Sequence, residues 1–269
     1  MDVAAQIDIT TDFQEDARRR DPDLYSPLLQ AFHRRLWSKP LPNGRVLELD
    51  PVKIRGVHVL SYRAPEGEFV LSSDTLANSS RGSRKSLYEA MGADANAEWH
   101  RAGGTIGGRL LFPRNRIDKK QTINQRRGTH PRIKDRFDLT LESIRRHYSG
   151  EISPLSETLE RYDDFFALFK TFDAYVSFFL LQDLVDTHGR VKFFGPFDDF
   201  AGRVLPDTMD EYRVFREGQL TFITARNCRI IDWATSARVG GDRSAINVRQ
   251  RSQSGSGRGP PIQTDIAAP

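Results

Sequence analysis

Residues 101–147 concentrate positively charged side chains that could bind an anion. This segment holds ten Arg and three Lys against four acidic residues, a net charge of +9. The whole chain has 40 Lys and Arg, 36 Asp and Glu and a net charge of only +4, so the excess is local. Guanidinium groups bind phosphate and carboxylate oxygens in a bidentate manner. The segment therefore predicts an anion site, although a charge run is also typical of a plain solvated face.

The other residue types in this segment favour the anion site. Arginines alternate with Asn, Thr and Gln around turn-forming residues, and these side chains also donate hydrogen bonds to oxyanions. Gly128 would let the backbone approach a ligand. A helix expected to begin near Arg132 would direct its first N–H groups there and bring Arg132 and Arg136 onto one anion. The predicted anion-binding residues are Arg114, Asn115, Arg116, Thr122, Asn124, Arg127, Gly128, Arg132 and Arg136.

Two histidines and two aspartates of the same segment could do acid–base chemistry. His130 and His147 are the candidate acid–base groups, and Asp118 or Asp138 is the candidate orienting carboxylate. With arginines stabilising the charge of a phosphoryl transition state, they would suit an enzyme acting on a nucleotide or another phosphorylated substrate, including a nuclease. The same aspartates could instead only neutralise the arginines, so the sequence leaves open whether the protein is an enzyme.

Three kinds of partner remain open. The first is nucleic acid, RNA more than duplex DNA, bound through its phosphates with Trp99, Phe112 and Tyr148 supplying stacking. The second is the nucleotide or phosphorylated substrate of the enzyme described above. The third is an acidic protein that meets the basic face of an interaction module. Salt dependence separates the first from the second, because polyphosphate binding weakens steeply as ions are added.

The familiar site motifs are missing from the sequence. There is no phosphate-binding loop, no His-Glu-x-x-His and no Gly-x-Ser-x-Gly. Glycines at 103–108 miss the dinucleotide-binding spacing and precede a predicted strand instead of a helix. The six histidines show no pair at metal-ligand spacing, so no metal site is predicted and no cofactor is assigned. The single cysteine, Cys228, excludes a disulfide scaffold and is expected to be a small core residue.

The elements that must position these residues are expected to form an α+β fold. A small, mainly antiparallel sheet is predicted from residues 45–72, 106–124 and 190–194, packed against four or five helices. Helices cluster in the second half of the chain, which disfavours a doubly wound parallel sheet. Eight aromatic residues between 162 and 179 have helical spacing and are expected to pack in the core. A long helix is expected from about Asp210 to Trp233.

The chain is expected to form a single domain, residues 1–239, that begins with an irregular lead-in at 1–23. Gly, Ser and Pro make up 12 of the 30 residues at 240–269, so this part is predicted to be a disordered tail. The amino terminus lacks the pattern of a secretory signal. The longest uncharged apolar stretch, residues 174–182, is far shorter than the roughly 20 residues of a bilayer span. The protein is therefore expected to be cytoplasmic and not to bind a membrane.

Several motifs are similar to those of a known family. They include Asn-Arg-Ile-Asp at 115–118, Arg-Phe-Asp-Leu-Thr-Leu-Glu at 136–142, Arg-Arg-His-Tyr at 145–148 and Pro-Phe-Asp-Asp-Phe at 196–200. On these motifs the chain resembles an uncharacterised family of bacterial cytosolic proteins, a domain of unknown function, over most of its length. The resemblance implies one family-length domain and brings no activity, cofactor or catalytic residue. It does not cover the tail after residue 240.

Overall fold

A computed structural model of the chain describes residues 7–54, 56–65, 67–77 and 84–253. The chain divides into two compact units, Met1–Ile231 and Asp232–Pro269. The first unit contains a four-stranded antiparallel sheet surrounded by helices, which confirms the predicted α+β class.

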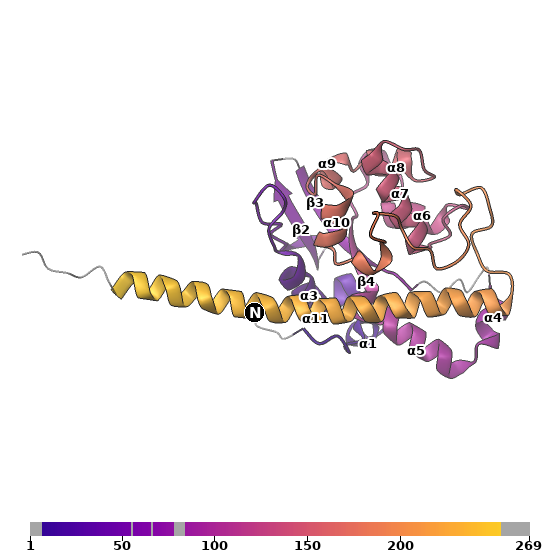
Figure 1. Cartoon of the computed structure of the whole chain (residues 1–269), viewed down its shortest axis with the longest axis horizontal. Helices are drawn as coiled ribbons and strands as arrows, with labels where there is room; N and C mark the ends of the chain where they lie inside the picture. The colour runs from indigo at the N-terminus through magenta and orange to yellow at the C-terminus, as the bar shows by residue number, and fades with distance from the viewer. Residues whose placement is uncertain (1–6, 55, 66, 78–83, 254–269) are drawn as a thin grey trace, which may run out of the picture. The chain divides into compact units, whose positions relative to one another are not determined.

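The strands follow one another along the sheet in the order β1-β2-β3-β4, and Figure 1 shows β2, β3 and β4 beside the helices α6–α10. Every pairing is antiparallel, with Leu60 opposite Leu71 and Ser73 opposite Leu111, for example. Two residues of the sequence separate β1 from β2 and β2 from β3, whereas β4 comes after two helices. The strands are β1 (Asp50–Ile54), β2 (Val57–Ala64), β3 (Gly67–Thr75) and β4 (Arg109–Pro113).

The helices of the described residues are more numerous than the four or five expected, because the chain between α7 and α11 forms several short helices. The α-helices are α1 (Phe13–Asp16), α2 (Pro22–Tyr25), α3 (Pro27–Trp37), α4 (Lys85–Ala90), α5 (Ala93–Gly104), α6 (Ile123–Thr129), α7 (Phe137–Ser149), α8 (Ser156–Glu160), α9 (Asp163–Ala167), α10 (Phe172–Phe178) and α11 (Met209–Gln253). Single 3-10 turns are η1 (Ile106–Gly108), η2 (Ile117–Lys119) and η3 (Gln182–Leu184).

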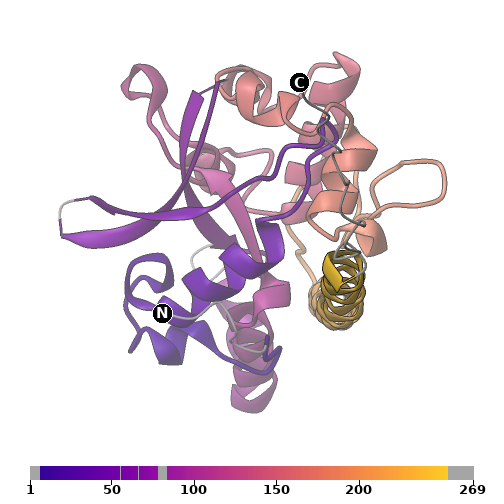
Figure 2. The same cartoon turned by 90° about the vertical axis from the view of Figure 1, so that its left-hand side faces the viewer.

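Helices cover both faces of β3. On one face, Arg127 of α6 donates a hydrogen bond of 2.7 Å to Asp74. On the other face, the backbone N–H and hydroxyl of Ser73 both donate to Asp23 of α2, at 3.0 and 2.7 Å. Figure 2 shows the same arrangement, with the indigo helices α1–α3 below the purple strands and the pink helices that follow β4 above them. Residues far apart in the sequence thus pack against Ser73 and Asp74 of β3.

The aromatic residues between 162 and 179 pack in the core, as predicted. Each of the eight is at most 8% exposed. Phe169 lies at their centre, with its ring 5.3 Å from Tyr175 and 5.0 Å from Phe178 between centroids. Aromatic pairs at these separations stabilise a core beyond their buried area. The segment is therefore mainly a packing element of the core.

The glycine-rich segment 103–108 lets α11 approach the start of β4. A Cβ atom on Gly107 would lie only 2.8 Å from the carbonyl oxygen of Ile223 in α11. The Gly107 N–H donates to the Asn227 side chain at 2.8 Å, and the buried Arg226 donates to the Gly107 carbonyl at 2.8 Å. These glycines serve close packing between elements, which explains why their spacing misses the dinucleotide-binding pattern.

Three local predictions are wrong. Thr122 to Asn124, expected to be a short strand, begin α6, because the Thr122 hydroxyl and Gln125 side chain form a capping box. Residues 190–194 form only one bridge, between Val185 and Val191, outside the sheet. Cys228 is exposed, since α11 turns Arg226 and Ile230 toward the core instead.

Helix α11 is longer than the predicted 210–233. Within the first unit it buries Tyr212, Phe215, Phe222, Ile223 and Ile230, whereas Ile231 is half-buried. It continues as a helix to Gln253 in the second unit. The predicted tail therefore begins in helical residues, and its part at 254–269 lies outside the described residues. No helix in the described part of the chain is long and apolar enough to cross a membrane.

Candidate functional site

Arg127, a predicted anion-binding residue, is completely buried in an internal ion-pair network. Its Nη1 atom lies 2.7 Å from an Asp74 oxygen and 2.8 Å from an Asp135 oxygen. The Nε–H donates to the Thr140 hydroxyl at 3.2 Å, and Nη2 donates to the Asp135 carbonyl at 3.0 Å. Burial raises the pKa of Asp135, and the positive charge of Arg127 opposes that rise. The Arg127 guanidinium, which was expected to bind a ligand, is thus already paired with two carboxylates.

Arg136 is also buried and paired. Its Nε donates to Asp138 at 3.1 Å, Nη2 bonds the other Asp138 oxygen, and Nη1 donates to the Val204 carbonyl at 2.8 Å. Asp138 has no exposed surface and also accepts the Phe194 N–H at 2.9 Å. The pair therefore fixes the start of α7 to residues 194–204, and Asp138 is not free to orient a catalytic histidine.

The predicted convergence of Arg132 and Arg136 on one helical turn is wrong. Helix α7 begins at Phe137, because residues 130–135 form tight turns in which Ile133 and Lys134 donate to the His130 carbonyl. Arg132 instead lies on the surface and donates to the Phe200 carbonyl at 2.9 Å. Arg132 and Arg136 therefore do not share a helical turn.

Three predicted polar residues bond to the chain itself. Asn115 accepts the Val70 N–H at 2.6 Å and donates to the Glu68 carbonyl, so it holds the end of β3. Thr122 caps α6, and Asn124 donates to a β3 serine. Gly128 is exposed, and a Cβ atom there would meet only the Asp135 carboxyl at 4.0 Å. Of these residues, Asn124 keeps one buried atom, Oδ1, without a hydrogen-bond partner among the described residues.

Apart from Lys120, which pairs with Glu157, the accessible cations of residues 114–134 have no ion-pair partner in the part of the chain that the structure describes. Arg126 and Arg132 lie near His130, since both lower its pKa in addition to the effect of burial. The hydrogen bond that Lys120 donates to Glu157 at 2.9 Å lowers the pKa of Glu157, and the positive charge of Arg126 lowers it as well. We call the following residues the 114–134 surface: Arg114, Arg116, Lys119, Arg126, Arg132 and Lys134.

The four candidate catalytic residues lie in separate surroundings. Asp118 is exposed on η2, with a φ of 52°. His130 accepts the Arg132 N–H at 3.1 Å, and His147 lies 3.2 Å from Asp163. Among the described residues, no hydrogen bond or ion pair joins any two of these candidates to each other. The structure thus forms no acid–base pair from them.

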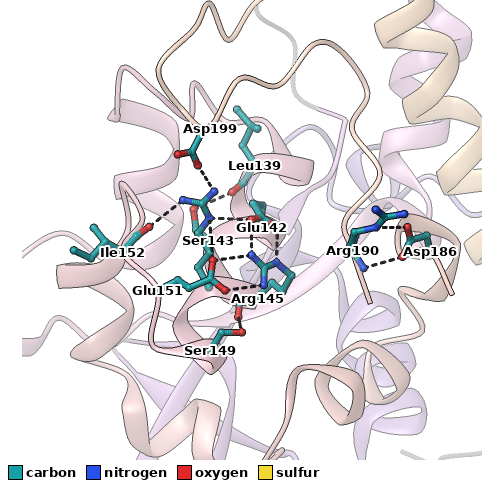
Figure 3. Close-up of polar contacts among 11 residues, drawn as sticks. Leu139, Glu142, Ser143, Arg145, Ser149, Glu151, Ile152, Asp186, Arg190 and Asp199 are labelled. Carbon is teal, nitrogen blue, oxygen red and sulfur yellow. Dashed lines mark hydrogen bonds and ion pairs between the residues drawn. The ribbon is translucent and has the colours of Figure 1, made fainter. Parts of the chain in front are cut away.

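A second polar network, which the sequence did not predict, lies at the carboxyl end of α7 (Figure 3). The Arg145 guanidinium binds both oxygens of Glu142 at 2.9 Å and both oxygens of Glu151 at 3.1 Å. Arg146 also binds Glu142 at 2.9 Å and pairs with Asp199. The hydrogen bonds that Arg145 donates to Glu142 and Glu151 raise its pKa. This network fixes the last turn of α7 against the loops that follow.

Beside this network lies a pocket of about 710 Å³ between the end of α7, α10 and residues 182–189. Asp186 shapes its rim by accepting the backbone N–H groups of His188 at 2.8 Å and Arg190 at 2.9 Å. These bonds, with the Arg190 side chain, lower the pKa of Asp186 to about 2. Figure 3 shows the Asp186–Arg190 pair apart from Arg145, on the other side of this space. The pocket falls within the range of volumes typical of small-molecule sites.

Residues 7–230 match the model described as "Family of unknown function (DUF6994)". The chain belongs to this family. The match covers both arginine networks and the pocket, and it confirms the resemblance to a domain of unknown function; bacterial origin and cytosolic location stay predictions. No curated protein and no solved structure matches the chain.

Sequence reasoning missed the pocket of this DUF6994 chain for a physical reason. Its residues come from three segments joined only by tertiary packing, and only Asp186-Thr187-His188-Gly189 carries a local signal, that of an aspartate-led turn. Among the described residues no group of three or more His, Cys, Asp or Glu side chains could hold a metal ion.

Proposed function

We propose that this protein binds the phosphate backbone of nucleic acid through the 114–134 surface. The observation that carries this proposal is the concentration of accessible cations without an ion-pair partner in one short stretch of the chain. Some exposed arginines elsewhere do have a carboxylate partner, as Arg63 has Glu68 at 3.1 Å and Arg213 has Asp210 at 2.9 Å. The cations of the 114–134 surface have none among the described residues, so their charge is available to an external anion.

Unpaired surface cations suit a polyanion better than a small enclosed anion. Each cation that contacts a phosphate releases condensed counterions from the nucleic acid, and this release drives binding. The buried arginines that a small-molecule clamp would need, Arg127 and Arg136, are already neutralised by aspartates. The surface therefore favours a nucleic-acid partner over an enzyme's nucleotide substrate.

The stacking residues expected from the sequence do not contribute to this surface. Trp99 and Phe112 are at most 1% exposed, and the Tyr148 hydroxyl donates to the Phe166 carbonyl at 2.7 Å. Without exposed rings beside the cations, binding would rest on phosphate contacts, which carry no sequence information. We therefore expect RNA and duplex DNA to bind with similar salt dependence, and the preference for RNA loses its support.

The test removes charge from this surface and from a matched surface elsewhere. The variant Arg116→Gln/Arg126→Gln/Lys134→Gln should bind labelled single-stranded RNA and duplex DNA more weakly at low salt. The slope of log affinity against log salt should fall by about 0.7–0.9 for each phosphate contact removed. Fluorescence anisotropy between about 50 and 200 mM salt measures both quantities.

The control variant, Lys53→Gln/Arg63→Gln/Arg213→Gln, removes the same charge from β1, β2 and α11. It should keep the slope of the natural protein. Equal slopes for the two variants would show that only net charge matters and would contradict the proposal. Absence of any salt-dependent binding by the natural protein would contradict it as well.

A further inference from the structure

Arg109, at the start of β4, is a buried cation without a partner. Its side chain has no hydrogen bond or ion pair within the described part of the chain, although the residue is only 5% exposed. Its Nε atom is fully buried, whereas the two Nη atoms keep accessible surface. The other buried arginines of the described chain all donate to protein acceptors: Arg127, Arg136, Arg216 and Arg226. An unpaired buried charge is costly, so Arg109 calls for an acceptor from outside.

The strand pairing directs Arg109 to the face of the sheet that α1–α3 cover. Arg109 lies opposite Thr75 of β3, and Ser73 of the same strand points to the same face two residues earlier. Ser73 donates both of its hydrogen bonds to Asp23 of α2. His33 of α3 lies near as well, since burial and the charge of Arg109 lower its pKa. Arg109 therefore faces residues of α2 and α3.

Asp23 offers an unpaired acceptor on this face. It is the carboxylate that acts most strongly on Arg109, yet the two residues form no ion pair in the described structure. Its Oδ1 atom accepts both bonds from Ser73. The Oδ2 atom has no hydrogen bond among the described residues and, unlike Nε of Arg109, is not fully buried. An unpaired donor and an unpaired acceptor, both accessible, thus lie on the same face of the sheet.

The charges around Arg109 disfavour both a simple anion and a simple cation. Burial lowers the pKa of Arg109, and four aspartates oppose this effect: Asp23, Asp74, Asp12 and Asp21. These carboxylates would repel an anion that approached the guanidinium. A cation would be repelled by Arg109 and would leave its N–H groups without an acceptor. A ligand that carries both charges meets both requirements.

From this arrangement we infer that the face of the sheet covered by α1–α3 binds a small zwitterion, a molecule with an ammonium and a carboxylate group. The carboxylate accepts hydrogen bonds from the Nη atoms of Arg109, and the ammonium group donates to Oδ2 of Asp23. The low exposure of Arg109 limits the ligand to a small molecule. This site is separate from the 114–134 surface and does not rest on the function proposed for that surface.

Small molecules of related structure test the inference. Glycine, β-alanine and 4-aminobutyrate carry both charges at increasing separation, whereas propionate and propylamine carry one charge each. At least one of the three zwitterions should raise the melting temperature and shift the NMR signals of the His33 ring, because a ligand of the folded state stabilises it. Propionate and propylamine should produce neither effect. Binding of no zwitterion, or equal binding of propionate or propylamine, would overturn the inference.

Replacing Arg109 separates a ligand site from a structural role. Arg109→Met keeps a long side chain without charge and should weaken binding of the zwitterion at least about tenfold. It should also melt at or above the temperature of the natural protein, since it removes an unpaired buried charge. The control Arg63→Met, in an exposed part of β2, should bind the zwitterion normally. A large fall in the melting temperature of Arg109→Met would show an internal partner, and unchanged binding would place the ligand elsewhere; either result refutes the site.

A second pair of variants tests the ammonium end. Asp23→Asn keeps an acceptor for Ser73 and removes the charge, so it should weaken binding of the zwitterion about tenfold. Asp50→Asn removes an exposed carboxylate from β1 and should bind as the natural protein does. Equal affinity of these two variants would contradict the assignment of Asp23.

Discussion

At the scale of residues, neighbouring arginines have opposite roles because of the carboxylates that tertiary structure brings to them. Arg127 is buried between Asp74 and Asp135, whereas Arg126, one position earlier on α6, is half-buried without an ion pair among the described residues. The sequence shows two identical side chains there. Whether an arginine of α6 is buried depends on which face of this helix packs against β3. The local pattern of charged residues does not reveal that face.

Replacing Arg127 should therefore destabilise the fold. In Arg127→Ala, two carboxylates lose their partner in the interior, and loss of one member of a buried ion pair costs about 3–5 kcal/mol. Arg126→Ala makes the same change in helix propensity and should cost no more than about 0.5 kcal/mol, the usual range for surface sites. Urea unfolding of both variants measures the difference. Equal stabilities would mean that the Arg127 network is not formed in solution.

The buried carboxyl of Asp23 predicts a pH-dependent contribution to stability. Burial raises its pKa from 3.8 to about 6, against the hydrogen bonds from Ser73. A raised pKa in the folded state means that the protonated form favours folding. Its stabilising contribution is complete below pH 4, falls as the pH rises to about 6 and is absent above that. One pKa unit corresponds to about 1.4 kcal/mol.

We expect the natural protein to lose roughly 2 kcal/mol of stability relative to Asp23→Asn between pH 4 and pH 7. The asparagine keeps an acceptor for the Ser73 N–H and does not ionise. Chemical unfolding of both proteins across this pH range gives the difference directly. A difference that stays constant with pH would show that Asp23 is ionised in the fold throughout.

At the scale of elements, the predictions that succeeded rest on long or repeated patterns. The antiparallel sheet, the aromatic core and most of the α11 face were all indicated by periodicity over many residues. The predictions that failed concern short segments whose structure depends on one specific contact. Residues 130–135 do not extend α7, because Asp135 is held against α6 by Arg127. Three-residue patterns cannot reveal such a contact.

The capping box at the start of α6 is formed by residues close together in the sequence, although residues 122–124 were predicted to be a strand. Thr122 accepts the Gln125 N–H at 3.3 Å, and the Gln125 side chain accepts the Thr122 N–H at 3.2 Å. Thr122→Ala removes this cap and should lower the free energy of unfolding by about 1 kcal/mol, while Thr122→Ser should restore most of it. If serine proves as destabilising as alanine in urea unfolding, the methyl group of Thr122 rather than its hydroxyl stabilises the helix.

At the scale of the whole molecule, local charge did not distinguish exposed cations from buried ones. The segment 101–147 has a net charge of +9, yet Arg127 pairs in the interior with Asp74 and Asp135, and Arg136 pairs there with Asp138. Asp74, the partner of Arg127, lies 53 residues earlier in the chain. The composition of this segment therefore indicated exposed cations, but it could not distinguish them from the buried arginines that stabilise the fold.

The division of the chain into units leads to a last expectation. All strands and the aromatic core lie within Met1–Ile231, so a chain ending at residue 239 should fold and melt within about 2 °C of the full protein. The removed part has a net charge of +2 in its sequence. If the 114–134 surface binds nucleic acid, the shortened chain should keep most of the salt dependence. If binding disappears while the melting temperature is unchanged, residues 240–269 carry it instead.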